Sequence, residues 1–121
     1  MYPNKQEKLA IPRPVRQDLN TLKLASLTLT ESLHTPNLTI PPHVHSTASI
    51  CLTLTGQAFE IIKGTRFVVH PGCAVIRAPE LKHANEYGPT PHRGFMIELD
   101  NKWLEACRHF SSVFENHRVF A

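Results

Sequence analysis

Residues 47–55 carry the clearest alternation of polar and apolar positions in the chain. Ile50, Leu52 and Leu54 share one parity, and Cys51 shares the other with small hydroxylated residues. Because successive side chains of a strand point to opposite faces, this pattern predicts a β-strand with one apolar and one polar face. We expect the apolar face to pack on a second sheet and the polar face to line a cavity for a metal or ligand.

Shorter runs of strand-forming residues surround this segment, with glycine and proline between them. We expect further strands at residues 21–33, 38–40, 57–63, 66–70, 73–77 and 93–99, with turns at 34–37, Gly56, Gly64 and Pro71-Gly72. Tight reversals at Gly56 and Gly64 predict a meander from residue 47 to residue 70. Residues 78–82 are expected to form a loop that leads to His83.

The hydrophobic period changes near the C-terminus. Trp103, Cys107, Phe110 and Phe114 recur at helical spacing after Asp100 or Asn101 as an N-cap. The spacing predicts an amphipathic helix of about three to four turns. Its aromatic stripe must be buried, either on the chain's own barrel or in a homodimer formed through this helix.

Length and composition fit one globular domain. The chain has 121 residues, 41% of them hydrophobic and 19% charged, which is ordinary for a folded protein. The net charge of +3 is mild and no basic run is present, so we expect no direct nucleic-acid binding by this chain. Neither a signal peptide nor a long apolar run is visible, so we expect a cytoplasmic protein without membrane contact.

We therefore expect an all-β fold, a small β-barrel or double-sheet jelly roll with one C-terminal helix. Residues 1–20, which are polar and contain Pro3, Pro12 and Pro14, are expected to form an N-terminal arm. Residues 21–99 would form the barrel, and residues 100–121 the helix and tail. Three cysteines without a close pair, Cys51, Cys73 and Cys107, indicate reduced thiols and no disulfide framework.

The candidate chemistry lies in three histidines. His43 and His45 are two residues apart, so they project from the same face of an extended segment. A folded β-structure could bring His83 opposite this pair. Three neutral imidazoles suit a divalent ion such as Zn, Fe, Ni, Cu or Mn, whose identity stays open.

The other polar candidates receive a structural interpretation. Arg66 and Arg77 could meet an anionic ligand, but a salt bridge on the outer surface explains them as well, and we favour that reading. Further metal donors could come from Thr47, Cys51 or Glu86, with none favoured by spacing. The remaining histidines are interpreted as surface or packing residues: His34, His70, His92, His109 and His117.

The pattern His43-x-His45-x3-Ser49-x6-Gly56 resembles the first motif of the cupin superfamily, and Gly72-x5-Ala78-x-Glu80-x2-His83 is similar to the second. The resemblance implies a metal bound by the three histidines. Ser49 stands where the family has a glutamate ligand, Ala78 where it has proline, and Glu80 where it has glycine. The site therefore resembles a three-histidine cupin with one negative charge fewer to hold a metal.

A narrower resemblance covers residues 20–115. The motif order, together with Ile97-Glu-Leu-Asp-x-x-Trp103-Leu104, is similar to the effector-binding cupin of AraC-type transcription regulators. In that family a helical region and a DNA-binding unit follow the cupin, and we expect no such unit within these 121 residues. The resemblance implies a sensing domain, either isolated, a fragment, or a stand-alone descendant of a regulator.

Three functions fit these observations, with catalytic residues unknown. The first is a small-molecule-sensing module with a three-histidine metal site. The second is a metal-dependent cupin enzyme of the dioxygenase or isomerase type. The third is a structural dimerisation module with a vestigial cavity.

Overall fold

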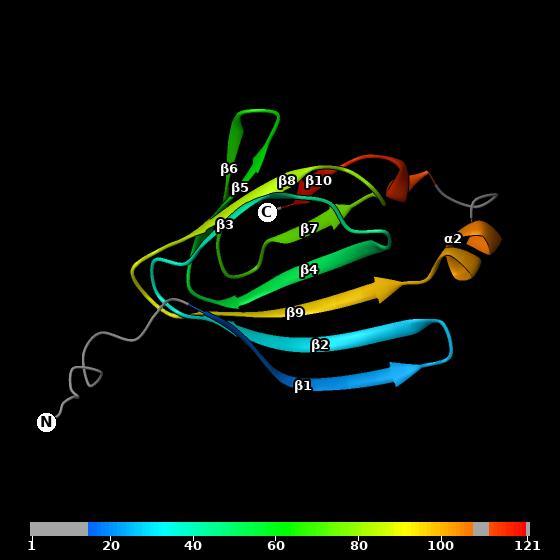
Figure 1. Cartoon of the computed structure of the whole chain (residues 1–121), viewed down its shortest axis with the longest axis horizontal. Helices are drawn as coiled ribbons and strands as arrows, with labels where there is room; N and C mark the ends of the chain where they lie inside the picture. Colours follow the sequence, from blue (N-terminus) through cyan, green and yellow to red (C-terminus); the bar gives the residue numbers. More distant parts are fainter. Residues whose placement is uncertain (1–14, 108–111, 121) are drawn as a thin grey trace, which may run out of the picture.

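The computed structural model describes residues 15–107 and 112–120, which form two antiparallel sheets around a cavity (Figure 1). The elements, in chain order, are β1 Arg16–Leu24, β2 Leu27–His34, β3 Thr39–His43, β4 Ala48–Thr55, β5 Ala58–Ile62, β6 Thr65–Val69, β7 Ala74–Arg77, β8 His83–Tyr87, β9 His92–Leu99, α2 Asn101–Cys107, η1 Val113–Glu115 and β10 Arg118–Phe120.

The chain alternates between the two sheets. One sheet has six strands in the order β1-β2-β9-β4-β7-β10, and the other has four in the order β3-β8-β5-β6. The expected all-β double-sheet fold is confirmed. The expected meander is wrong, because β4 pairs with β7 and β9 in the larger sheet while β5 and β6 form a hairpin in the smaller one.

Several strand boundaries differ from the expected ones. Residues 21–33 are not one strand: β1 and β2 form a hairpin that turns at Ala25 and Ser26. β1 begins at Arg16, inside the stretch expected to be an arm. His83 is not carried by a loop but begins β8, which the sequence did not predict as a strand.

The C-terminal part also differs. Asp100 caps α2 as expected, because its carboxylate accepts a 2.9 Å hydrogen bond from the backbone N–H of Trp103. The helix ends at Cys107, and Phe114 lies in the separate 3-10 turn η1, so a continuous helix to Phe114 is wrong. His109 and Phe110 lie outside the described residues. The chain then adds β10 beside β7.

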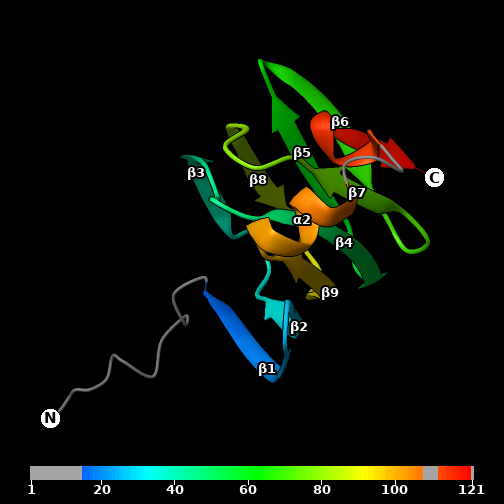
Figure 2. The same ribbon diagram turned by 90° about the vertical axis from the view of Figure 1, so that its right-hand side faces the viewer.

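No helix in the described part of the chain has the length and apolar character needed to cross a membrane. Figures 1 and 2 place α2 at the ends of the strands, after β9, and not across a sheet face. The helix therefore lies outside the layers that the two sheets form.

Of the two roles expected for the faces of β4, one is confirmed and the other is wrong. Cys51 and Thr53 line the cavity as expected. Leu52 and Leu54, however, are 37% and 45% exposed and do not pack on the other sheet. Among the buried apolar residues, Val69, Cys73 and Val75 form one cluster, against which Cys51 and Val119 pack.

Candidate metal and ligand site

The inner faces of both sheets enclose a cavity of about 300 Å³. This volume lies at the small end of the range for ligand-binding pockets. The residues around it include five histidines together with serine, threonine, asparagine, arginine and glutamate side chains. Apolar side chains, among them Val69, Val75 and Met96, also line it, so the cavity suits a small molecule that carries both polar and apolar groups.

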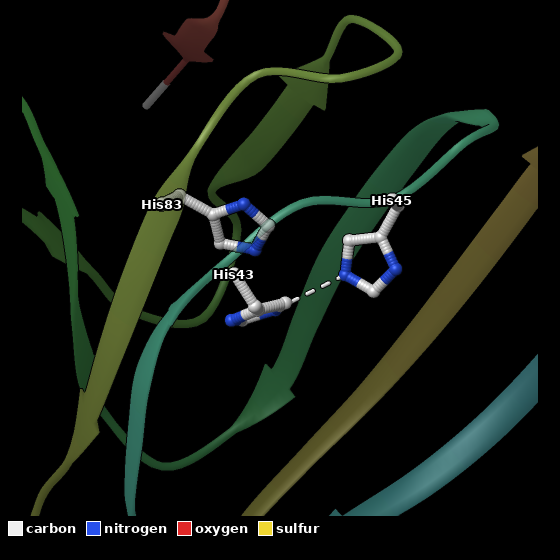
Figure 3. A group of neighbouring side chains, drawn as sticks. All are labelled: His43, His45 and His83. Carbon is white, nitrogen blue, oxygen red and sulfur yellow. Dashed lines mark hydrogen bonds between the residues drawn. The ribbon is translucent and has the colours of Figure 1, made fainter.

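His43, His45 and His83 come together at one side of this cavity, as the sequence predicted for a metal site (Figure 3). His43 ends β3 and pairs in register with His83 at the start of β8, so the two imidazoles are neighbours across the ladder. Their ring centroids are 4.3 Å apart, and one potential ligand atom from each of the three residues lies within 4.8 Å of the other two.

The geometry of the pair His43 and His45 fits a shared cation. Nδ1 of His43 donates a 2.8 Å hydrogen bond to the carbonyl oxygen of Pro41, because a carbonyl can only accept. Nε2 of His43 is thereby left with its lone pair, 3.1 Å from Nε2 of His45. Two nitrogens bound to one Zn²⁺ at a tetrahedral angle lie about 3.4 Å apart. The two Nε2 atoms would therefore need to move apart only slightly to bind one ion.

The loop before His83 is bonded to the backbone of His45 through Glu80. The backbone N–H of Glu80 donates a 2.7 Å hydrogen bond to the carbonyl oxygen of His45. Glu80 has φ of +65°, the left-handed conformation that the glycine of the family motif would adopt without strain. The glutamate has thus replaced the glycine while the backbone conformation is kept.

The three-histidine site is also prepared electrostatically. Burial, followed by the charge of Arg77, lowers the pKa of His83 to about 3, and burial followed by His43 lowers the pKa of His45. Both imidazoles are therefore neutral near pH 7 and can offer lone pairs to a metal. His83 is 2% exposed and its Nδ1 has no hydrogen-bond partner.

A buried ion pair forms the second part of the site, and the sequence did not predict it. Glu60 is 1% exposed and accepts hydrogen bonds of 2.7 and 2.8 Å from Nε and NH2 of Arg77, while Asn85 donates to the same carboxylate. NH1 of Arg77 lies 2.8 Å from the sulfur of Cys51. The expected surface salt bridge of Arg77 is wrong, because its guanidinium points inward and pairs with the buried carboxylate of Glu60.

The charge of Glu60 is held firmly. Burial raises the pKa of this carboxyl, but the hydrogen bonds from Arg77 and the approach of His117 outweigh it and hold the pKa well below its usual range. Nε2 of His117 lies 3.5 Å from the carboxylate without forming a hydrogen bond. His117 was expected at the surface or in packing, and it packs between Glu60 and His83.

A third cluster lines the cavity around His34 and His92. Their Nδ1 atoms are 3.2 Å apart, and Nε2 of His92 lies 3.1 Å from the hydroxyl of Thr53. His34 stacks on Tyr87 with 4.2 Å between ring centroids. Burial, then the neighbouring His92, lowers the pKa of His34 to about 3, and burial lowers that of His92, so both rings are neutral.

Sequence signals for these residues existed but were weak. His34 follows Thr30 and Ser32 on the polar parity of β2, the parity that faces the cavity. Glu60 alternates with Ala58 inside an otherwise apolar strand, which marks a charged residue on an inner face. Neither pattern predicts which side chain contacts His34 or Glu60, because those side chains lie on other strands.

Other candidates stay away from the cavity. Glu86 pairs with Arg66 at 2.8 Å and both side chains are largely exposed, so the structural interpretation of Arg66 is confirmed and Glu86 is no metal donor. Thr47 is not among the cavity residues, and His70 is exposed. Ser49 is 3% exposed on the inner parity of β4.

Comparison with solved structures places the fold among cupins. The Cnp3 cupin domain of Schizosaccharomyces pombe matches with a TM-score of 0.65 at 12% identity, covering 87% of this chain and 80% of that one. AerE of Microcystis aeruginosa matches with a TM-score of 0.62 at 19% identity, covering 73% of this chain. RemF, a polyketide cyclase of Streptomyces resistomycificus, matches with a TM-score of 0.56 at 26% identity, covering 61% of this chain.

This chain spans only 46% of the AerE structure and 54% of the RemF structure. No curated protein matches the sequence significantly. The model of the AraC-like ligand binding domain, in contrast, matches residues 28–119, which include every strand from β3 to β9 and the three histidines. The chain therefore belongs to the AraC-like ligand binding domain family.

Proposed function

We propose that this domain is a small-molecule-sensing module that binds its ligand in the cavity through a divalent metal held by His43, His45 and His83. The observation that supports this proposal most is the convergence of three imidazoles, two of them kept neutral by burial, on one wall of the cavity. When bound there, a divalent ion would act as a Lewis acid toward an oxygen atom of the ligand.

The charges of the cavity favour an anionic ligand. Glu60 and Arg77 neutralise each other, His34, His45, His83 and His92 are neutral near pH 7, and Ser49 replaces the glutamate that the family motif carries. A divalent ion on three neutral ligands keeps its full charge of +2, which a carboxylate of the ligand would compensate. We infer a small carboxylate as the ligand class.

Thermal melting with defined ligands tests this function. The protein, loaded with Zn²⁺ or Ni²⁺, is melted with a panel of small mono- and dicarboxylates and with neutral sugars, beside a His43→Ala/His45→Ala variant. We expect a carboxylate to raise the melting temperature of the loaded wild type only. Equal shifts in melting temperature in the variant would show that the metal takes no part in ligand binding. No shift with any compound would favour the alternative of a vestigial cavity.

One observation favours a second candidate, a metal-dependent enzyme. The chain of Thr53, His92 and His34 is continuous in hydrogen bonds and borders the cavity, so it could accept or return a proton at His34. A cyclase and a lyase are among the proteins of similar fold. Turnover of a bound carboxylate that disappears in His34→Gln while binding persists would identify an enzyme.

A further inference from the structure

Two buried histidines beside the three-histidine wall keep their ring nitrogens unpaired. Among the residues that the structure describes, the buried side-chain nitrogen and oxygen atoms without a hydrogen-bond partner are Nδ1 of His83 and both ring nitrogens of His117. The two ring centroids are 5.7 Å apart, and the side chain of His117 is only 7% exposed. Leaving buried polar atoms unpaired is costly, so this concentration of them in one place needs an explanation.

The carboxylate of Glu60 offers an acceptor position next to His117. Among the described side chains, Arg77 and Asn85 donate to its Oε1, and Arg77 alone donates to its Oε2. Each carboxylate oxygen can accept two hydrogen bonds. Nε2 of His117 lies 3.5 Å from Oε2, so a small movement of this ring would let it donate there. A neutral His117 that donates through Nε2 keeps the lone pair of its Nδ1.

His83 needs an acceptor for its ring proton once it binds a metal. Figure 3 shows one of its ring nitrogens on the side of His43 and His45 and the other on the opposite edge of the ring. A neutral imidazole that binds a metal through Nε2 carries its proton on Nδ1, and it almost always donates this proton to a neighbouring group. Ligand atoms of His83, His117 and Glu60 all lie within 4.8 Å of one another.

We propose that His117 positions His83 for the metal, with Nδ1–H of His83 donating to Nδ1 of His117 and Nε2–H of His117 donating to Oε2 of Glu60. This chain of hydrogen bonds gives a partner to each of the three unpaired nitrogens. It holds the ring of His83 with Nε2 toward His43 and His45, while His117 itself does not contact the metal. The inference rests on the proposed function, because it requires a metal at the three histidines.

The same hydrogen bonds connect the C-terminal segment to the metal site. His117 directly precedes β10, an edge strand that pairs with β7 through three residues. Val119 is the residue of β10 that packs on the buried apolar cluster. A strand held by so few contacts opens locally and exchanges its amide protons. Because coupling between two sites is reciprocal, a segment that strengthens metal binding must open less often when the metal is bound.

The backbone of Leu81 is the competing acceptor for the proton of His83. It acts on His83 from two residues away, but Nδ1 of His83 forms no hydrogen bond with it. If Leu81 accepted this proton in the metal-bound domain, replacing His117 would not change the affinity for the metal. The two acceptors therefore predict different results for variants of His117.

Two substitutions separate the hydrogen bonds of His117 from its volume. His117→Phe keeps a planar ring without nitrogen, whereas His117→Gln keeps a donor and an acceptor. The affinity of the full chain for Zn²⁺ is measured by competition with a chromophoric chelator, with His70→Phe, at an exposed histidine, as the control. Hydrogen exchange of β10 is followed with and without Zn²⁺, and β6, which is also an edge strand, is the internal reference. Circular dichroism confirms folding.

We expect His117→Phe to bind Zn²⁺ about 10- to 100-fold more weakly than wild type, and His117→Gln and His70→Phe to stay within about threefold of it. Zn²⁺ should slow exchange in β10 of wild type and leave β6 unchanged. In His117→Phe, Zn²⁺ at a saturating concentration should no longer slow exchange in β10.

A folded His117→Phe with wild-type affinity would overturn this inference alone, in favour of Leu81. Exchange in β10 that Zn²⁺ does not slow in wild type would overturn it as well, whether or not the variants fold. Equally weak binding by His117→Phe and His117→Gln would mean that His117 acts through packing. A wild type that binds no Zn²⁺ would overturn the proposed function together with this inference.

Discussion

The inner and outer faces of the six-stranded sheet differ in the reverse of the usual sense. β-sandwiches generally bury apolar side chains between their sheets and turn polar ones to water. Here the inner face presents His34, Thr53 and His92 to a cavity, and the outer face presents Leu22 and Leu52 to solvent. The difference places the titratable and hydrogen-bonding side chains of this sheet on the cavity side.

The inner face depends most on its ion pair, so removing Glu60 should produce the largest effect. Glu60→Ala leaves the guanidinium of Arg77 buried without its partner, and we expect a loss of about 3–5 kcal/mol in the free energy of unfolding. Urea denaturation measures it. Glu86→Ala, which breaks the exposed pair with Arg66, should cost less than about 1 kcal/mol. Similar losses in both variants would show that the inner pair is no more important than a surface one.

Gly56, just after β4, lies against the backbone of Pro91 and His92, where β9 begins. A Cβ at Gly56 would collide with the carbonyl oxygen of Pro91, whereas a Cβ at Gly64 would meet nothing within 4 Å, although both residues have positive φ. We expect Gly56→Ala to destabilise by about 2–4 kcal/mol and Gly64→Ala by about 1 kcal/mol. The difference between the two losses of stability measures the cost of the collision with Pro91. Equal losses in urea denaturation would contradict that cost.

The neutral histidines of the inner face should make stability fall in mild acid. The pKa of His34 is about 3 in the fold and about 6.5 when unfolded, so the unfolded chain binds more protons below pH 6.5. Stability is full above pH 6.5 and is lost as the pH falls toward 3, by about 2 kcal/mol from this residue between pH 6.5 and 5.

Denaturation at a series of pH values measures that slope in metal-free protein. His34→Gln should flatten the slope, while His70→Gln, at an exposed position, should leave it unchanged. An unaltered slope in His34→Gln would mean that this ring is protonated in the folded state.

The smallest expected effect concerns the backbone beneath the metal site. Glu80→Gly relieves a left-handed φ and should stabilise the protein by about 0.5–1 kcal/mol, because glycine adopts this conformation freely. Glu80→Ala keeps the strain and should stay within about 0.5 kcal/mol of wild type. Melting curves compare them, and an equal gain in both would trace the effect to the lost carboxylate instead.

The sequence predicted those parts of the fold that depend on local patterns. The alternation of residues 47–55 predicted β4, and the glycines at 56 and 64 predicted the turn after β4 and the turn between β5 and β6. The spacing of His43 and His45, with the family motif around His83, predicted the residues that now converge on one cavity wall.

The parts that escaped prediction depend on contacts between distant strands. Alternation separates the two faces of β4, and the polar face lines the cavity as predicted, but alternation does not say what packs on the apolar face. The pairing of Glu60 with Arg77, 17 residues apart, follows from the jelly-roll crossing of β5 and β7. β10 was missed because three residues carry too little pattern to identify an edge strand.

The central claim is that the inner face holds a divalent metal on three neutral histidines. Elemental analysis for Zn, Fe, Ni, Cu and Mn, on protein purified without an affinity tag and beside the His43→Ala/His45→Ala variant, tests it most directly. The account predicts about one metal per chain in wild type and none in the variant. A folded wild type that carries no metal and takes up none on dialysis against these ions would contradict it.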